Sequence, residues 1–297
     1  MKRCLIWGMG VEFANNLHMI QYYELTREIE VVGITSNQRY YASILDYQFV
    51  PKEKIESVKF DFLVIATSNA ILDSVLQEAV ELGIEENRIV PISVMKLPRF
   101  NFDKYQKLKS HTPTIFAPNC WAGLTYHSLA LPFKSSFINM FEDHDDYIKF
   151  LKKPKYYLEQ PLEFVEMRCN TTLKREYPVV KCGDILLYFN HYVSFDEAVS
   201  CWNRREKRID WDNLLIMFFD ENYDRAREFL NLPYENKICF VPFLLHEKGV
   251  VSIEYKKECP DLPFFNTVNK AASGGALYYD VFELLLNQNV VPIANIK

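Results

Sequence analysis

The stretch Arg3-Cys4-Leu5-Ile6-Trp7-Gly8-Met9-Gly10 runs from apolar residues into a glycine turn. A short apolar run bounded by glycine is typical of a buried strand, so we predict a strand over residues 3–8. The spacing of the next residues, 11–23, predicts a helix. A strand, a glycine turn and a helix in this order indicate the start of a Rossmann-like α/β domain.

The same alternation continues along the first third of the chain. We predict further strands at 30–35, 61–67 and 88–92, and a helix at 70–82 that ends at Gly83. Strands that alternate with helices favour right-handed crossovers and a parallel sheet. The apolar rhythm is then lost, so we expect a Rossmann-like domain over 1–98, a linker over 99–112 and a second domain over 113–297.

The second domain shows a new alternation of apolar runs and helical patterns. Strands are expected at 114–117, 184–189, 214–219 and 238–243, helices at 121–131 and 142–160, and a hairpin over 162–181 that turns near Asn170-Thr171. The predicted fold class is therefore α/β: an N-terminal Rossmann-like parallel-sheet domain followed by a second α/β domain with an inserted helix and hairpin.

Composition and charge exclude several classes of protein. The formal net charge is −5, which gives no basic excess to neutralise phosphates, so we expect no nucleic acid partner. The seven cysteines are scattered without CxxC pairs, which favours reduced thiols, no metal and a cytoplasmic location. No apolar window reaches the roughly 18 residues that a membrane helix needs, so no integral membrane segment is expected.

Polar residues follow several of the predicted strands. In open α/β sheets, ligands bind outside the carboxyl ends of the strands. This rule selects six residues: Asn119, Cys120, Asn190, His191, Asp220 and His246. The alternative is that these residues are polar only because turns generally are.

Cys120 is expected in the first turn of a helix, where the helix dipole favours a thiolate. His191 is then a candidate base and Asp220 a candidate group to orient that base, so these three residues form the predicted catalytic set. The alternative for Cys120 is an inert buried cysteine beside Trp121.

The helix after His191 places a permanent charge among apolar side chains. Ser194 and Glu197 form a capping box that fixes the helix start, and helical spacing then puts Arg205 on an apolar face. The guanidinium needs an anionic partner: a phosphate or carboxylate of a ligand, bound together with Arg208, or a structural ion pair with a residue such as Asp184 or Asp210.

The glycine turn of the first domain supplies only part of a dinucleotide motif. Gly8 and Gly10 match the first two glycines of GxGxxG, but Phe13 stands in the third place, and no carboxylate follows the second strand to hold an NAD ribose. We expect the turn either to bind a nucleotide or nucleotide-sugar or to be structural only. The acidic run over 142–146 is expected to serve the helix dipole rather than a metal.

Two resemblances to known families rest on the residues quoted above and on their spacing. Residues 3–92 look like the Rossmann-like domain that begins many bacterial sugar-modifying proteins. Residues 114–255 resemble an uncharacterised bacterial family of exopolysaccharide biosynthesis proteins, although Ala122 replaces an expected glycine. The second resemblance is carried by Asn119-Cys120-Trp121, Gly123, Tyr126, Phe150-Leu151, Tyr157-Leu158, His191-Tyr192, Ser194, Glu197-Ala198, Trp202, Arg205, Arg208-Ile209 and Asn213.

The second resemblance implies a role in making or decorating surface polysaccharide. We therefore expect a transferase or hydrolase that moves a group, for example an acyl group, on a nucleotide- or lipid-linked sugar, with a nucleotide-sugar or coenzyme A as candidate cofactor. A non-catalytic nucleotide-sugar binding or assembly protein is the alternative, and a homo-oligomer is compatible with either. The expected substrate-binding residues are Asn119, Trp121, Tyr126, Tyr192, Trp202, Arg205 and Arg208.

Overall fold

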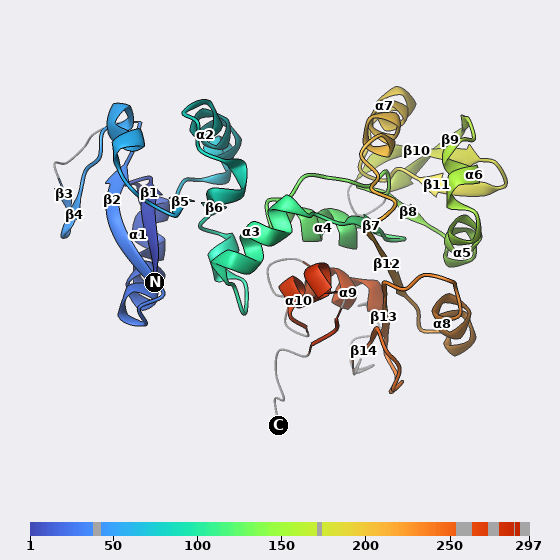
Figure 1. Ribbon diagram of the computed structural model, residues 1–297. Helices are drawn as coiled ribbons and strands as arrows, with labels where there is room; N and C mark the ends of the chain where they lie inside the picture. The colour runs from blue at the N-terminus through green and yellow to red at the C-terminus, as the bar shows by residue number, and fades with distance from the viewer. Residues whose placement is uncertain (38–42, 171–173, 254–262, 273–278, 288, 292–297) are drawn as a thin grey trace. The chain divides into compact units, whose positions relative to one another are not determined.

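The computed structural model describes every residue except 38–42, 171–173, 254–262, 273–278, 288 and 292–297 (Figure 1). The chain forms two compact units, Met1–Ser110 and His111–Lys297. Both units are α/β, which confirms the predicted fold class. None of the described helices combines the length and the apolar character that crossing a bilayer requires.

Unit 1 is built on a four-stranded parallel sheet. The strand order is β2-β1-β5-β6, and each neighbouring pair is parallel. Its elements are β1 (Lys2–Trp7), α1 (Val11–Leu25), β2 (Ile29–Thr35), β3 (Ser43–Ile44), β4 (Tyr47–Gln48), η1 (Lys52–Ser57), β5 (Phe62–Ile65), α2 (Asn69–Glu81), η2 (Glu86–Arg88), β6 (Ile89–Pro91), η3 (Val94–Lys96) and α3 (Phe102–Ser110).

The segment expected to be a linker, 99–112, contains helix α3. One face of this helix buries Phe102, Tyr105 and Leu108. Its apolar residues are separated by lysines, which hides the helical period in the sequence, but burial of that face fixes the helix. The boundary between the two units falls at the end of α3 in the chain, between Ser110 and His111.

Unit 2 contains a second parallel sheet, of strand order β14-β13-β12-β7. Its strands are β7 (Thr114–Phe116), β12 (Leu214–Phe219), β13 (Lys237–Val241) and β14 (Val250–Ser252). The helices that follow β7 and β12 are α4 (Trp121–Ser128) and α8 (Tyr223–Leu230), and the last described helices are α9 (Phe264–Ala272) and α10 (Val281–Asn287).

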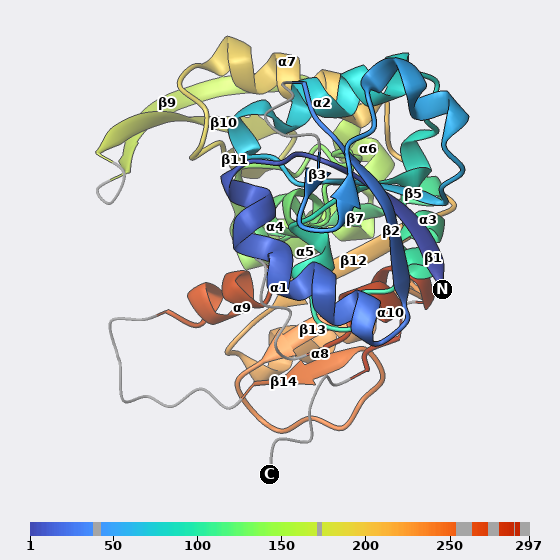
Figure 2. The same ribbon diagram turned by 90° about the vertical axis from the view of Figure 1, so that its left-hand side faces the viewer.

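An antiparallel sheet of order β8-β11-β10-β9 is inserted between β7 and β12. Its elements, with the accompanying helices, are β8 (Phe141–Glu142), α5 (His144–Lys152), α6 (Pro154–Leu158), β9 (Leu162–Asn170), β10 (Arg175–Cys182), β11 (Ile185–Tyr188) and α7 (Phe195–Glu206). The β9–β10 hairpin was expected, and in Figure 2 its strands form a long ribbon. The Thr171 part of its predicted turn lies outside the described residues.

The helix expected over 142–160 differs from the structure in two ways. Glu142 belongs to strand β8, and the remaining residues form α5 and α6. The break comes at Lys153, whose ψ of 57° is not helical, and Pro154 starts the next helix. The residue before a proline avoids the helical conformation, which accounts for the break.

One apolar core joins the two sheets of unit 2. It brings Phe116 of β7 and Phe218 of β12 into the same cluster as Phe150 of α5 and Trp202 of α7. The Phe137 ring centroid lies 4.5 Å from that of Phe150 and 5.3 Å from that of Trp202. The insertion is therefore packed on the parallel sheet as part of one domain.

Gly8 is required by the backbone of unit 1. Its φ is +130°, and a Cβ at this position would lie 2.3 Å from the carbonyl oxygen of Ala66. At Gly10, two residues later, a Cβ would meet nothing within 4 Å. The close approach of the β1 end to the β5 end thus accounts for the first glycine without any ligand.

We expect Gly8→Ala to destabilise unit 1 by more than about 2 kcal/mol, because the new Cβ meets backbone in a conformation that L-residues rarely adopt. Gly10→Ala is the matched control and should change the free energy of unfolding by less than about 1 kcal/mol. Urea denaturation of the full chain measures both values. Equal stability of the two variants would contradict the structural role of Gly8.

Candidate functional site

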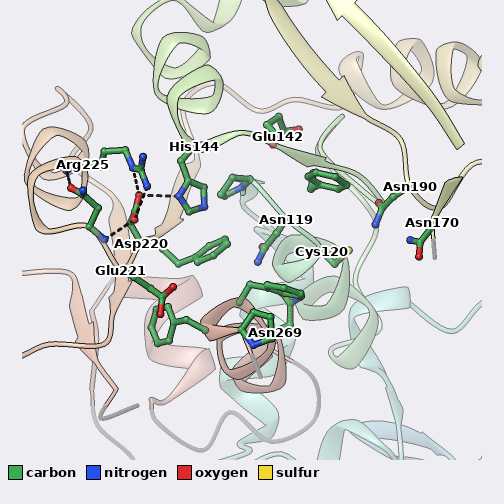
Figure 3. Close-up of a pocket in the computed structure, with 17 residues that line it drawn as sticks. Asn119, Cys120, Glu142, His144, Asn170, Asn190, Asp220, Glu221, Arg225 and Asn269 are labelled. Carbon is green, nitrogen blue, oxygen red and sulfur yellow. Dashed lines mark hydrogen bonds and ion pairs between the residues drawn. The ribbon is translucent and has the colours of Figure 1, made fainter. Parts of the chain in front are cut away.

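A pocket of about 780 Å³ lies in unit 2 where several chain segments converge (Figure 3). Ligand pockets generally have volumes of roughly 300–1,000 Å³. The segments that follow the parallel neighbours β7 and β12 contribute to its wall, together with the β8–α5 segment, Asn170, Asn190 and the start of α9. The lining residues are Pro118, Asn119, Cys120, Phe141, Glu142, His144, Asn170, Asn190, Phe219, Asp220, Glu221, Asn222, Arg225, Pro263, Phe264, Phe265 and Asn269.

A histidine and a buried carboxylate form a pair in the pocket wall. His144 Nδ1 lies 2.8 Å from Asp220 Oδ2. Arg225 donates to the same carboxylate through Nε at 2.6 Å and Nη2 at 3.2 Å, and the Asn222 amide donates at 2.7 Å. In Figure 3 these side chains converge on Asp220. A carboxylate with so many donors holds the histidine ring in one orientation.

The electrostatics of this pair keep the Asp220 carboxylate ionised. Burial would raise the pKa of Asp220, but the hydrogen bonds from His144, Arg225 and the Asn222 amide outweigh burial and lower that pKa to about 2. The ionised carboxylate accepts the Nδ1 proton, which leaves the lone pair of the neutral ring on Nε2. Nε2 has no hydrogen-bond partner among the described residues.

Glu142 is a second carboxyl group in the same wall, with the opposite electrostatic environment. It is 4% exposed, and within the described part of the chain neither carboxyl oxygen has a hydrogen-bond partner. Burial, together with the charge of Asp146, raises its pKa well above the ordinary value. Burial without partners therefore favours the uncharged form of Glu142, which can donate a proton.

Cys120 and His191 do lie together, but the third residue is Arg175 rather than Asp220. Cys120 Sγ is 3.5 Å from His191 Nε2, and Arg175 Nη2 is 3.2 Å from His191 Nδ1. A guanidinium can only donate, so Nδ1 accepts and the proton of the neutral ring is on Nε2. His191 therefore presents a donor towards the sulfur, whereas the predicted base would need to accept the thiol proton.

The thiol itself is not activated in this arrangement. Cys120 stands at the N-cap of α4, as expected, but burial, followed by the Glu142 charge, raises the pKa of the thiol to about 11. Burial and the Arg175 charge lower the pKa of His191. A protonated thiol beside a neutral histidine does not form the thiolate–imidazolium pair that the predicted nucleophile requires.

The rest of the pocket combines amides with aromatic rings. Five lining residues are asparagines and four are phenylalanines. Among the described residues, Asn119 Nδ2, Asn190 Oδ1 and Asn269 Oδ1 are buried without a hydrogen-bond partner. Buried polar atoms are rarely left unpaired, so these atoms are available to hydrogen-bond a ligand or ordered water.

Three predicted binding residues, Arg205, Tyr192 and Arg208, lie outside the pocket lining. Arg205 is 7% exposed and donates to the Tyr192 hydroxyl and to the Ile138 carbonyl, while its guanidinium carbon lies 5.4 Å from the Phe133 ring centroid. Among the described residues no acidic side chain pairs with Arg205, so the predicted ion pair with Asp184 or Asp210 is not formed. Arg208 is exposed and donates to the Phe133 carbonyl at 3.4 Å.

Trp121, Tyr126 and Trp202 build the fold of unit 2. Trp121 and Tyr126 are fully buried and Trp202 is 2% exposed; none of the three lines the pocket. The Tyr126 hydroxyl donates to the Pro113 carbonyl and accepts from the Ile115 amide, which ties α4 to β7. His246 is exposed and also lies outside the pocket lining.

Sequence reasoning missed Glu142, His144, Arg175 and Arg225 as site residues. The acidic run over 142–146 carried a usable signal, because a histidine is placed among its acids at a helix start. Arg175 and Arg225 gave no signal, since only the fold brings them to His191 and Asp220. Within the described residues, no group of three His, Cys, Asp or Glu side chains could hold a metal ion.

Two family models match this chain. A family model described as "Domain of unknown function (DUF1919)" matches residues 92–285, more than half of the sequence. The chain belongs to the DUF1919 family. Every residue that lines the pocket falls within the DUF1919 match. Residues 1–90 match a model described as "C2185-like, N-terminal".

An uncharacterised protein of Haemophilus influenzae is similar to this DUF1919 chain. The two sequences are 30% identical over 200 residues, which cover 64% of this chain and 92% of the relative.

We expect Glu142→Gln to stabilise the protein increasingly as pH rises. The pKa of Glu142 is raised in the folded state. The contribution of this carboxyl group to the free energy of unfolding is therefore fully present below about pH 4.5 and is lost as the pH rises towards the folded-state pKa. Glutamine has the same shape and does not ionise. Thermal unfolding should give a melting temperature roughly 2 °C or more above wild type at pH 8 and a smaller difference at pH 5.

The control for this measurement is Glu176→Gln, which removes an exposed carboxylate from β10. A Glu142→Gln variant that is less stable than wild type at pH 8 would show that the buried carboxyl has a structural partner after all.

Asp220→Asn should have the opposite pH dependence. The pKa of Asp220 is depressed in the folded state, so its contribution is present above about pH 4 and lost as the pH falls towards 2. At pH 7 we expect a loss of at least about 2 kcal/mol. Urea titrations at pH 7 and pH 3 measure the free energy of unfolding, and Asp212→Asn, which changes an exposed aspartate, is the control. A loss of stability that is the same at both pH values would contradict the role of the ionised Asp220.

Proposed function

We propose that this protein works in bacterial surface polysaccharide synthesis, where it transfers or removes a group on a sugar by acid–base catalysis. The pathway follows from the resemblance of residues 114–255 to exopolysaccharide biosynthesis proteins. The chemistry follows from one observation: Glu142, a carboxyl group whose pKa is raised by burial, and His144, a histidine oriented by a carboxylate, line the same pocket. Groups whose environments push their pKa values apart serve as acid and base.

The roles of the two groups follow from their protons. His144 Nε2 accepts the proton of an attacking hydroxyl, from the sugar or from water, as that oxygen bonds to the transferred group. The bond between this group and its former partner atom breaks; that atom is an oxygen of a sugar or carrier, or the sulfur of coenzyme A. Glu142 donates its proton to the departing atom. Asp220 stabilises the resulting imidazolium and keeps Nε2 in place.

The lining of the pocket supports a sugar as the ligand. An asparagine side chain both donates and accepts, which matches a hydroxyl group that does the same. Phe141, Phe219, Phe264 and Phe265 supply apolar surface for the C–H faces of a ring. An uncharged sugar ring can hydrogen-bond to the asparagines through its hydroxyl groups and pack against the phenylalanines through its C–H faces.

The test is an incubation of purified protein with nucleotide-linked sugars, with and without acetyl-coenzyme A, followed by mass spectrometry. We expect a product whose mass shows gain or loss of a group. His144→Gln and Glu142→Gln should each lower the rate by roughly 100-fold or more while the fold is retained. His127→Gln, an exposed histidine on α4, is the matched control.

A strain that lacks the gene and is complemented with the same variants extends the test to the cell. The variants that fail in vitro should also fail to restore surface polysaccharide composition. Sugar binding without any mass change in the wild type would overturn the catalytic proposal and favour the non-catalytic binding or assembly role.

A further inference from the structure

Arg175 is a partly buried cation that contacts the pocket wall from outside: neither Arg175 nor its partner His191 is among the lining residues. It starts strand β10 and pairs across the hairpin with Asn170, which lines the pocket. Its Nη2 atom donates to His191 Nδ1 and, at 3.3 Å, to the carbonyl of Asn190, a second lining residue. Through these neighbours its guanidinium is fixed beside the pocket wall.

No anion compensates the Arg175 charge among the described residues. The ion pairs of this part of the chain do not include Arg175, and its Nε atom is buried without a hydrogen-bond partner. Glu176, the next residue on the strand, points to the opposite face. Arg225, by contrast, is held by the Asp220 carboxylate. A guanidinium keeps its charge, so this environment favours an anionic ligand.

Further donors surround the same end of the pocket. Arg175 fixes the proton of His191 on Nε2, which faces Cys120 Sγ at 3.5 Å, and Asn119 Nδ2 is an unpartnered donor. Cys120 caps α4, whose positive dipole end lies at this position. The ionised Asp220 lies at the other side of the pocket from Asn170 and Asn190 in Figure 3. An anion therefore meets donors at one end and a carboxylate at the other.

We propose that Arg175, His191 and Asn119 form a subsite for a phosphate or carboxylate group of the substrate, whose uncharged sugar ring lies against Glu142 and Asn269. This inference rests on the proposed function, since it takes the ring to be a sugar. It narrows the substrate class to sugars with an attached anionic group: sugars linked through phosphate to a carrier, or uronic acids. Guanidinium groups recognise both anions through paired hydrogen bonds.

The experiment compares binding of matched probes by isothermal titration calorimetry. Glucose, glucose 1-phosphate and glucuronate form one set, and the corresponding galactose compounds form a second. The anionic member of at least one set should bind at least tenfold more tightly than its neutral sugar. A preference for the phosphate identifies a carrier-linked sugar, and a preference for the carboxylate identifies a uronic acid.

Variants show whether Arg175 creates this preference. Arg175→Gln should reduce the preference to less than twofold, whereas Arg175→Lys should keep part of it because the charge remains. Arg168→Gln is the matched control: it removes an arginine of the same hairpin that is exposed and paired with Glu166. Thermal unfolding of each variant verifies that it is folded.

Two results would overturn the subsite: no anionic probe binds more tightly than its neutral sugar, or the preference survives in Arg175→Gln. Repeating the titrations in His144→Gln separates this inference from the catalytic proposal. If His144→Gln keeps the anion preference but the wild type converts no sugar, the subsite is supported and the catalytic proposal is rejected. If the wild type converts a sugar but shows no anion preference, the catalytic proposal is supported and the subsite is rejected.

Discussion

The buried carboxylate of Asp220 is the interaction on which the site depends. It stands at the end of β12, and its partners come from α5 and from the start of α8. It therefore ties the inserted antiparallel layer, through the α5 helix, to the parallel sheet. A charge this deeply buried is tolerated only when donors surround it, so the same donors that stabilise the carboxylate also fix the position of His144.

The two histidines of the site have opposite proton arrangements because of the groups on their Nδ1 atoms. A carboxylate on His144 leaves an acceptor at Nε2, while a guanidinium on His191 leaves a donor there. One imidazole is thereby suited to remove a proton and the other to bind electron-rich atoms. The charge of the side chain at Nδ1, negative for His144 and positive for His191, decides which nitrogen of each ring carries the proton.

The sequence predicted the architecture well, because apolar strands and glycine turns leave clear local patterns. The rule that ligands bind outside the carboxyl ends of parallel strands also selected Asn119, Cys120 and Asp220, and all three line the pocket. The rule worked for β7 and β12, which are parallel neighbours. It had no basis for His191, since β11 belongs to the antiparallel sheet, and only packing of that sheet brings His191 to Cys120.

The charged partners could not be predicted for a related reason. Asp220 and His144 are 76 residues apart, and His191 and Arg175 meet across the β10–β11 hairpin at a register that the sequence does not specify. Arg205 was singled out correctly as a charge on an apolar face. Its partners, however, are a hydroxyl, a carbonyl and an aromatic ring, which spacing along a helix cannot reveal.

The raised pKa of Cys120 has a consequence for the chemical durability of the pocket. Peroxides and alkylating agents react with thiolates, and a thiol with a pKa of about 11 is almost entirely protonated in neutral solution. The sulfur in the wall is thus a slow target for oxidants and electrophiles.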